Sequence, residues 1–398
     1  MKQKVTVQIK RVLSHYDAIL AILVLFICVF GLIMIYSASS YRAEYYYHDS
    51  KLYFRRQGLF LIGGTVLMIL VSMISYKVYF KRVKIFKFRI PLVLFLGVIC
   101  LGLHIYAMFN GHEAGGSSRW IQLGGSGVNL QPSELSKVFF VLGGTFIVAK
   151  LKRLINTGRI IQNFLGFVII FLVFCPILGI VAYQNLSSAI ILTGIIACLI
   201  FCASMDKRYL IPVVILLVAG GWWMIASKGY RSERIMHFIY PESMDPGDQI
   251  LQGLYAIASG GLFGKGIGNS VQKLGNIPEV HTDMIFTIIC EELGIIGGIA
   301  LIGLFLLLLW RIFKIALNAP DLAGSLIATG VFAQIALQVM MNIAVVTNSM
   351  PATGVPLPFV SYGGSSLLIL MAEMGVVLNV SKKTSEVIPD EDEELLEE

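Results

Sequence analysis

Residues 284–310 read MIFTIICEELGIIGGIALIGLFLLLLW, and this stretch decides the class of fold. Apart from two neighbouring acids, Glu291 and Glu292, it carries no charge until it ends. A helix rises 1.5 Å per residue, so about 20 apolar residues cross the hydrocarbon core of a bilayer, which is about 30 Å thick. The stretch therefore predicts a membrane-spanning helix, and it raises the question why two acids lie near its start.

The rest of the chain is similarly apolar. Of its 398 residues, 57% are hydrophobic and only 14% are charged, and the mean hydropathy is +0.79. A soluble domain of this size carries far more charge. The apolar runs are continuous rather than alternating, which disfavours a membrane β-barrel. The composition predicts an all-α polytopic membrane protein.

Ten apolar runs are predicted to span the membrane, and the charges between them test that count. With the N-terminus inside, the inner segments hold 20 Lys and Arg residues and the outer loops hold ten. This asymmetry satisfies the positive-inside rule and predicts that both termini are cytoplasmic, with a long outer loop between the seventh and eighth spans. The predicted spans lie near residues 17–37, 57–76, 90–109, 133–150, 161–181, 186–204, 209–226, 284–310, 322–346 and 363–380.

The charge is distributed unevenly along the chain. Residues 386–398 carry eight acids and no base. We therefore expect a transmembrane domain over 1–383 and a disordered, solvated acidic tail over 384–398. Residues 1–383 carry 31 bases against 16 acids, a net charge of +15. Much of this excess faces anionic lipid at the inner surface, so it indicates membrane lipid rather than nucleic acid as a partner.

Two outer loops are long and polar, which in a compact membrane protein is typical of functional segments. The first covers about residues 110–132, and just after it Glu134 and Lys137 share one helix face at i, i+3 spacing. Charges at this depth usually pair or line a polar cavity. The two residues therefore form either a self-neutralising pair or a border for an anionic ligand. Trp120 is either an interfacial anchor or part of a functional surface.

The second long loop covers about residues 227–283. Arg231, Arg234 and Lys265 are among its cations, and because exposed loop charges contribute little to stability we expect them to serve substrate binding. The piece 249–259 is amphipathic and could lie along the outer membrane surface. The piece GGLFGKGIGNS (260–270) lacks the features of a P-loop, so a flexible turn is the default, although its glycines allow backbone N–H groups to face an anion.

Three acids lie in or against the eighth span. Asp283 is at its outer end, where a carboxylate is favourable against the helix dipole, so a helix cap is one role and a reaction carboxylate is the other. Glu291 and Glu292 are two turns deeper and cannot be caps. Because carboxylates facing lipid are costly, both must point into protein or a wet cavity, with Lys137 or an Arg of a neighbouring span as the expected partner.

Several of these segments carry a resemblance to a known family. The chain resembles the SEDS proteins, the FtsW/RodA/SpoVE family of bacterial cell-wall polymerases, in an order that covers the whole membrane core. PATGVPLPFVSYGGSS, residues 351–366, is more similar to the FtsW/SpoVE branch than to RodA. The matching pieces are RWIQLGGSGVNLQPSELSK (119–137), GYRSERIMHFIYPESMDPGDQILQGLYAIASGGLFGKGIGNSVQK (229–273), IPEVHTDMIFTIICEELGIIG (277–297) and VTNSMPATGVPLPFVSYGGSSLL (346–368).

The resemblance implies a peptidoglycan glycosyltransferase in the bacterial plasma membrane, at the division septum or in sporulation. Such a protein polymerises lipid II into β-1,4-linked glycan at the outer face and expels undecaprenyl pyrophosphate. The implied partners are a class B penicillin-binding protein and other divisome or sporulation proteins. The implied catalytic residue is Asp283, and the expected substrate-binding residues are Arg119, Trp120, Glu134, Lys137, Arg231, Arg234, Lys265 and His281. Asn185 replaces the acid that family members commonly carry.

The residues fit this chemistry, with alternatives left open. The acceptor hydroxyl needs a base, and Asp283 is the candidate. Asp283 could instead hold a divalent cation, Mg²⁺ or Mn²⁺, that bridges the pyrophosphate. The competing functions are a lipid II flippase that uses Glu134, Lys137, Glu291 and Glu292 as a polar path, and a scaffold that only positions a transpeptidase.

Overall fold

The structure is a computed structural model of the whole chain. It describes residues 16–85, 88–113, 118–123, 128–155, 160–203, 236, 238–240, 248–274, 277 and 280–384. Of the ten predicted spans, nine coincide with helices in this part of the chain, while 209–226 and the tail from 385 onward lie outside it. The nine are α2 (Ala18–Tyr47), α3 (Leu52–Met73), α4 (Leu92–Asn110), α5 (Pro132–Ile155), α6 (Ile160–Gln184), α7 (Leu186–Cys202), α11 (Ile285–Leu317), α12 (Leu322–Val346) and α13 (Gly364–Thr384).

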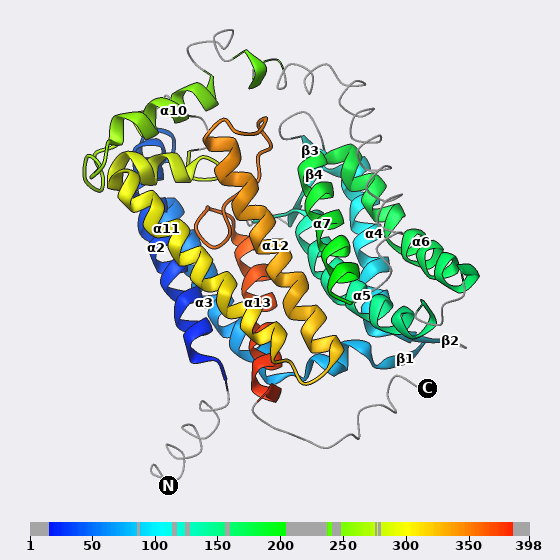
Figure 1. Cartoon of the computed structure of the whole chain (residues 1–398). Helices are drawn as coiled ribbons and strands as arrows, with labels where there is room; N and C mark the ends of the chain where they lie inside the picture. The colour runs from blue at the N-terminus through cyan, green and yellow to red at the C-terminus, as the bar shows by residue number, and fades with distance from the viewer. Residues whose placement is uncertain are drawn as a thin grey trace, which may run out of the picture.

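The described helices form a polytopic membrane bundle. Six of them, α2, α3, α4, α11, α12 and α13, are long and apolar enough to cross a bilayer. The helices α2, α3, α11 and α13 pack on one side and α4 to α7 on the other, while α12 contacts α11 and α13 as well as α5 and α7 (Figure 1). α12 therefore joins the two groups. The predicted all-α class is confirmed.

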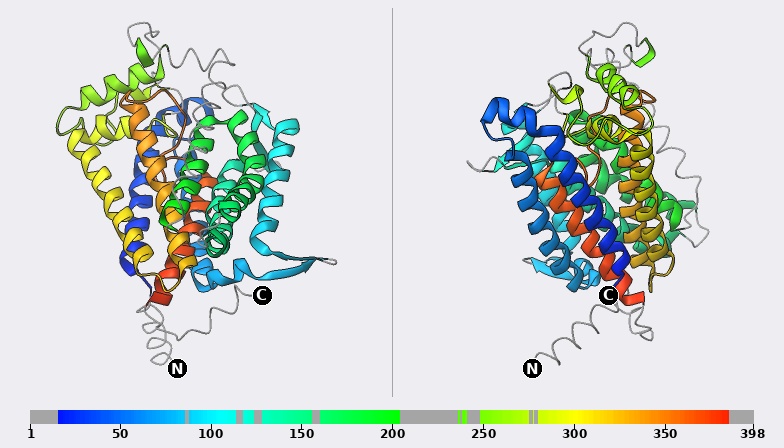
Figure 2. Two further views of the ribbon diagram at one scale, coloured as in Figure 1. Left: turned by 45° about the vertical axis from the view of Figure 1, so that its right-hand side comes forward. Right: turned by 90° about the vertical axis from the view of Figure 1, so that its left-hand side faces the viewer.

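The short elements are sorted between the two ends of the bundle (Figure 2). The start of α2, the end of α13, the turn η1 (Tyr76–Phe80) and the hairpin β1 (Arg82–Ile85)–β2 (Phe88–Pro91) lie at one end. The strands β3 (His112–Glu113), β4 (Ser118–Leu123) and β5 (Val128–Leu130) and the helix α10 (Gln249–Gly260) lie at the other. The basic hairpin, the start of α2 and the end of α13 thus share the side that the charge count assigns to the cytoplasm.

The helix α11 breaks at Gly294, and the break accepts a turn of the preceding loop. Gly294 has φ 71° and ψ −176°, so the backbone hydrogen bonds of the helix are interrupted there. The N–H groups of Lys265 and Gly266 donate to the carbonyls of Glu291 and Glu292, 3.0 and 2.9 Å away. Beyond the break, the N–H of Ile295 donates to the carbonyl of Gly261 over 2.9 Å. Turn and helix are therefore one rigid unit.

Glycines make this close contact possible. A Cβ atom at Gly264 would lie 2.2 Å from the carbonyl oxygen of Glu292, and one at Gly294 would lie 2.2 Å from that of Leu262. Both residues also have positive φ, which side chains disfavour. The expectation of a flexible turn over 260–270 is wrong, because the glycines serve close packing against the helix backbone.

The helix α10 packs on the same unit. Its buried residues are Ile250, Gly253, Ala256 and Gly260, and α11 is its main neighbour. The buried face of this helix therefore consists mainly of small residues that pack against protein. Asp248 caps the helix, since its Oδ1 accepts from the N–H of Ile250 over 2.8 Å.

Candidate functional site

A cavity of about 260 Å³ opens between α3, α5, α12 and α13. Its walls come from segments far apart in the sequence, including β4 and the segment that links α12 to α13. Three of the predicted site residues line it, namely Trp120, Glu134 and His281. The PATGVPLPFVSYGGSS segment supplies much of the rest of the wall, from Pro356 to Ser366. Three of the four sequence pieces that carried the resemblance, 119–137, 277–297 and 346–368, are thus brought to one place.

Glu134 and Lys137 form the ion pair that their spacing predicts. Lys137 Nζ lies 2.7 Å from Glu134 Oε1, and the side chains are only 2% and 6% exposed. The other carboxylate oxygen of Glu134 accepts from the Ser366 hydroxyl over 2.8 Å. A second buried acid, Glu373 of α13, lies within electrostatic range of Lys137. Glu134 thus lines the cavity, while Lys137 and Glu373 are buried behind this part of its wall.

Trp120 reaches the cavity from the strand β4. This strand pairs with β3 on one edge and with β5 on the other, where Ile121 faces Leu130. The small sheet holds the tryptophan beside the start of α5, so the role as a lining residue is favoured over that of a lipid anchor. Arg119 precedes it in the same strand, and its side chain lies outside the described part of the chain.

His281 lies in the wall as a neutral side chain. It is 3% exposed, and its ring packs against those of Tyr53 and Tyr362, with centroids 4.4 and 5.5 Å away. Burial, reinforced by the charge of Arg42, lowers the pKa of His281 from 6.5 to about 4. Its Nδ1 has no hydrogen-bond partner among the described residues. A buried polar atom of this kind is expected to bind a ligand or water in the cavity.

Asp283 directly follows two cavity-lining residues, and the interpretation of Asp283 as a helix cap is wrong. α11 begins at Ile285, its N-cap position is Met284, and no side chain caps it. The half-buried Asp283 carboxylate instead accepts from Thr282 Oγ1 over 3.2 Å and from Gln249 Nε2 over 3.4 Å. These partners of the carboxylate are therefore side chains and not the N–H groups of the helix terminus.

Three consecutive carbonyl groups fix the backbone of this segment. The carbonyl of His281 accepts from the Tyr362 N–H over 2.9 Å, and that of Thr282 from the Ser361 hydroxyl over 2.5 Å. The carbonyl of Asp283 accepts from the amide of Asn342 on α12 over 2.7 Å. The segment that carries Asp283 is therefore hydrogen-bonded both to the segment 351–366 of the cavity wall and to α12.

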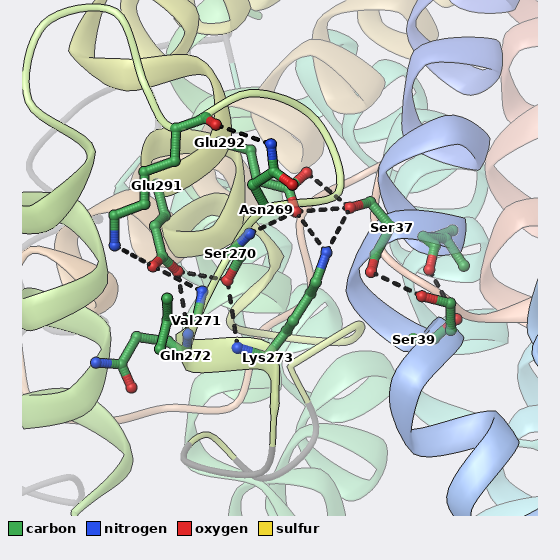
Figure 3. Close-up of polar contacts among 12 residues, drawn as sticks. Ser37, Ser39, Asn269, Ser270, Val271, Gln272, Lys273, Glu291 and Glu292 are labelled. Atoms are coloured by element: carbon green, nitrogen blue, oxygen red, sulfur yellow. Dashed lines mark hydrogen bonds and ion pairs between the residues drawn. The ribbon is translucent and has the colours of Figure 1, made fainter.

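The two deep acids of α11 pair with the outer loop (Figure 3). Lys265 Nζ lies 2.8 Å from Glu291 Oε1, and Lys273 Nζ lies 2.9 Å from Glu292 Oε1. Both glutamates are fully buried. The expectation that Lys137 or an intramembrane Arg pairs with them is wrong, because the loop folds back over the start of α11 and delivers its own cations.

Backbone and hydroxyl groups complete the solvation of these carboxylates. Glu291 accepts from the Val271 N–H over 3.0 Å and makes a very short contact with the Ser270 hydroxyl. Glu292 accepts from the hydroxyl of Ser37 on α2 at 2.6 Å (Figure 3). The N–H groups that face these carboxylates belong to Ser270 and Val271 at the end of the loop, whereas those of Gly264 and Gly266 donate to backbone carbonyls. The acids thus tie α2, the loop and α11 together.

Comparison with known proteins identifies the family. The model of the FtsW/RodA/SpoVE family, described as cell cycle proteins, matches residues 17–386. The chain belongs to the FtsW/RodA/SpoVE family. It is 38% identical to stage V sporulation protein E of Bacillus subtilis over 371 residues, which cover 92% of this chain and 97% of that protein. It is 34% identical to a probable peptidoglycan glycosyltransferase FtsW of a Geobacter species, over 94% and 98% of the two chains.

Solved structures agree with this assignment to the family. One is a chain from a study of how a peptidoglycan synthase complex coordinates polymerization and crosslinking, with a TM-score of 0.72 and 27% identity over 93% of this chain and 99% of that one. Another is the rod shape determining protein RodA of Thermus thermophilus, with a TM-score of 0.66 and 26% identity over 93% and 98%.

Asn185, at the position where the resemblance implies an acid, caps a helix. Its Oδ1 accepts from the N–H groups of Ser187 and Ser188 at the start of α7. Asparagine and aspartate are equally good helix caps. Asn185 therefore caps the helix as an aspartate would, but it carries no negative charge.

The predicted cations divide into three groups. Arg231 and Arg234 lie outside the described residues. Lys137 borders the cavity through Glu134. Lys265 is committed to the buried Glu291, and its side chain is only 31% exposed. The expectation that Lys265 is a loosely held loop charge is therefore wrong, since its removal leaves a buried carboxylate behind.

Sequence reasoning missed Glu373, Tyr53 and Asn342. Glu373 had a usable signal, because it is a single acid in the middle of the predicted span 363–380. Tyr53 and Asn342 had no usable signal in the sequence, since an aromatic residue near a helix start and an amide inside a helix are common. Their roles depend on which helices become neighbours.

Proposed function

We propose that this chain is a peptidoglycan glycosyltransferase that polymerises lipid II into β-1,4-linked glycan at the outer face of the plasma membrane. The relatives named above support the activity. The observation that carries the proposal is the placement of Asp283, whose backbone is fixed by Asn342 and whose carboxylate does not cap α11. The site lies among membrane helices, as a lipid-linked donor requires.

Asp283 has the properties of a reaction carboxylate. In the proposed step, it accepts the proton of the acceptor sugar's 4-hydroxyl while that oxygen forms a bond to the anomeric carbon of the donor. The bond from that carbon to the pyrophosphate breaks, and undecaprenyl pyrophosphate leaves with the electron pair. Holding both reactants in line contributes as much as the proton transfer, which explains why the segment is fixed so firmly.

The cavity supplies groups for the polar part of the substrate. Lys137 brings a buried positive charge, and the neutral His281 offers a hydrogen-bonding nitrogen beside aromatic rings. Trp120 presents an apolar face with one N–H donor, a combination suited to the faces of sugar rings. Arg119, Arg231, Arg234 and Lys265 remain proposed contacts of the pyrophosphate, with Lys265 required first for the fold.

A divalent cation would bind here only together with the phosphate groups of the substrate. Among the described residues, no group of three or more His, Cys, Asp or Glu side chains could hold a metal ion. Mg²⁺ is often bound by one or two carboxylates together with phosphate oxygens. Asp283 would be its protein ligand, and the cation would neutralise the leaving pyrophosphate.

We further propose that the chain works with a class B penicillin-binding protein and other divisome or sporulation proteins, at the division septum or in sporulation. The similar chain from a peptidoglycan synthase complex and the relatives FtsW and stage V sporulation protein E support this assignment. The crosslinking partner would act on the strands that this chain extends.

A lipid II flippase is the second candidate, favoured by the buried ionisable residues Glu134, Lys137 and Glu373 in the bundle. It is weakened by Glu291 and Glu292, which are bound to the outer loop and cannot form part of a path across the membrane. The test is reconstitution of the purified protein with labelled lipid II in liposomes. Glycan ladders support the polymerase, leaflet exchange without ladders supports the flippase, and neither product supports a scaffold.

A further inference from the structure

The turn that is bound into the break of α11 exposes an unusual set of side chains. Leu262 and Phe263 at its tip are 62% and 81% exposed, although they are large and apolar. Their surface continues onto the side of α11 through the exposed Ile295, Ile296 and Ile299. The contact is direct, because the N–H of Ile296 donates to the carbonyl of Leu262 over 3.3 Å. The apolar tip is therefore continuous with the surface that α11 presents to lipid.

The position of the tip along α11 sets its depth. The inner end of the span is marked by Arg311, which pairs with Asp17 over 2.7 Å at the start of α2. Ile295 lies 16 residues before Arg311, or about 24 Å along a helix. The hydrocarbon core is about 30 Å thick, and a tilted helix needs more residues to cross it. The tip of the turn thus lies at the level of the outermost hydrocarbon.

Backbone hydrogen bonding suits the turn to that depth. Non-helical backbone is costly in hydrocarbon unless its polar groups find partners within the protein. Here the carbonyls of Gly261 and Leu262 and the N–H groups of Lys265 and Gly266 all bond to the broken part of α11. The backbone groups of α11 that lose their helical partners at the break are the ones that bond to the turn.

We infer that the turn 261–268 is inserted into the outer leaflet, with Leu262 and Phe263 in contact with acyl chains. Ile267 of the same turn is also apolar and 57% exposed. Because the turn is bound to α11 eight residues beyond Asp283, lipid contact fixes the height of Asp283 above the membrane. The inference concerns the position of the turn and does not depend on the proposed function.

Collision experiments test the location directly. A nitroxide at Phe263→Cys, in the full chain with its native cysteines replaced, is compared in lipid nanodiscs with labels at Leu306→Cys and Asn269→Cys. Leu306 is a lipid-facing control on α11, 61% exposed, and Asn269 is an exposed polar residue of the same loop. We expect oxygen to relax the label at 263 as it does at 306, and a water-soluble nickel complex to relax mainly the label at 269.

A second measurement avoids the cysteine replacements. Benzoylphenylalanine at position 263 of the otherwise native chain is irradiated in nanodiscs of phosphatidylglycerol and phosphatidylethanolamine. Adducts with acyl chains support the inference.

Two kinds of result would contradict it. Strong relaxation of the 263 label by nickel would place the tip in water. Shielding of that label from both oxygen and nickel, or crosslinks to a second protein chain, would show protein contact. Either result overturns the inference.

Discussion

Replacing Lys273 by methionine tests the tie between the outer loop and the bundle. Lys273 is 6% exposed, and its partner Glu292 is fully buried. Removing one member of a buried pair costs about 3–5 kcal/mol, because the remaining charge is left without compensation. Glu292 would keep its bonds to the Ser37 hydroxyl and the Ser270 N–H. We therefore expect Lys273→Met to lower the free energy of unfolding by about 3 kcal/mol, the lower end of that range.

The assay is a denaturant titration of purified protein in mixed micelles, with two comparison variants. Arg55→Met removes a surface ion pair with Asp49, whose side chains are 64% and 33% exposed, and should change the midpoint little. The double variant Lys273→Met/Glu292→Gln removes the buried charge as well and should recover most of the loss. If Lys273→Met is as harmless as Arg55→Met, or if the double variant is the less stable one, the reasoning is refuted.

Three further predictions concern neighbouring features. Lys265→Met should destabilise the chain less than Lys273→Met does, because Lys265 is partly screened by solvent, and equal losses in the same titration would contradict this. Gly294→Ala should lower the thermal midpoint strongly, while Gly303→Ala, where a Cβ atom meets nothing within 4 Å, should keep or raise it. The pKa of His281 falls from 6.5 to about 4 on folding, so its contribution to stability is complete above pH 6.5 and is lost as the pH drops towards 4. His281→Gln should flatten that part of the pH profile, and an unchanged profile would argue against a neutral histidine.

Much of the fold follows from hydropathy and charge. Runs of about 20 apolar residues leave few choices in a membrane, and nine of the predicted spans are helices in the described part of the chain. The break at Gly294 was not predictable, because glycine inside an apolar run is common and its φ depends on the turn that docks there. Periodicity cannot anticipate a backbone contact between residues about thirty positions apart.

Some residues of the cavity wall were predictable from the sequence, but the contacts between them were not. Polar and aromatic residues beside the membrane pointed to Trp120, Glu134 and Lys137, and two of them line the cavity. The partners of Glu291 and Glu292 were misassigned, because the sequence shows depth along a helix and not which loop covers it. The cap interpretation of Asp283 failed for a related reason, since α11 begins two residues later and leaves that carboxylate to other contacts.

The most direct test is glycan synthesis by Asp283→Asn. Asparagine keeps the shape and an accepting oxygen but loses the negative charge, and the residue caps no helix, so the protein should keep its thermal midpoint and its binding to the transpeptidase partner. Asp248→Asn is the matched control, because Asp248 is a true helix cap and asparagine caps as well.

Both variants are purified with the partner and assayed on lipid II. We predict normal ladders from Asp248→Asn and a loss of about 10²–10⁴-fold or more in rate for Asp283→Asn, the range that general base catalysis supplies. Near-normal polymerisation by a well-folded Asp283→Asn protein would contradict the assignment of Asp283 as the reaction carboxylate.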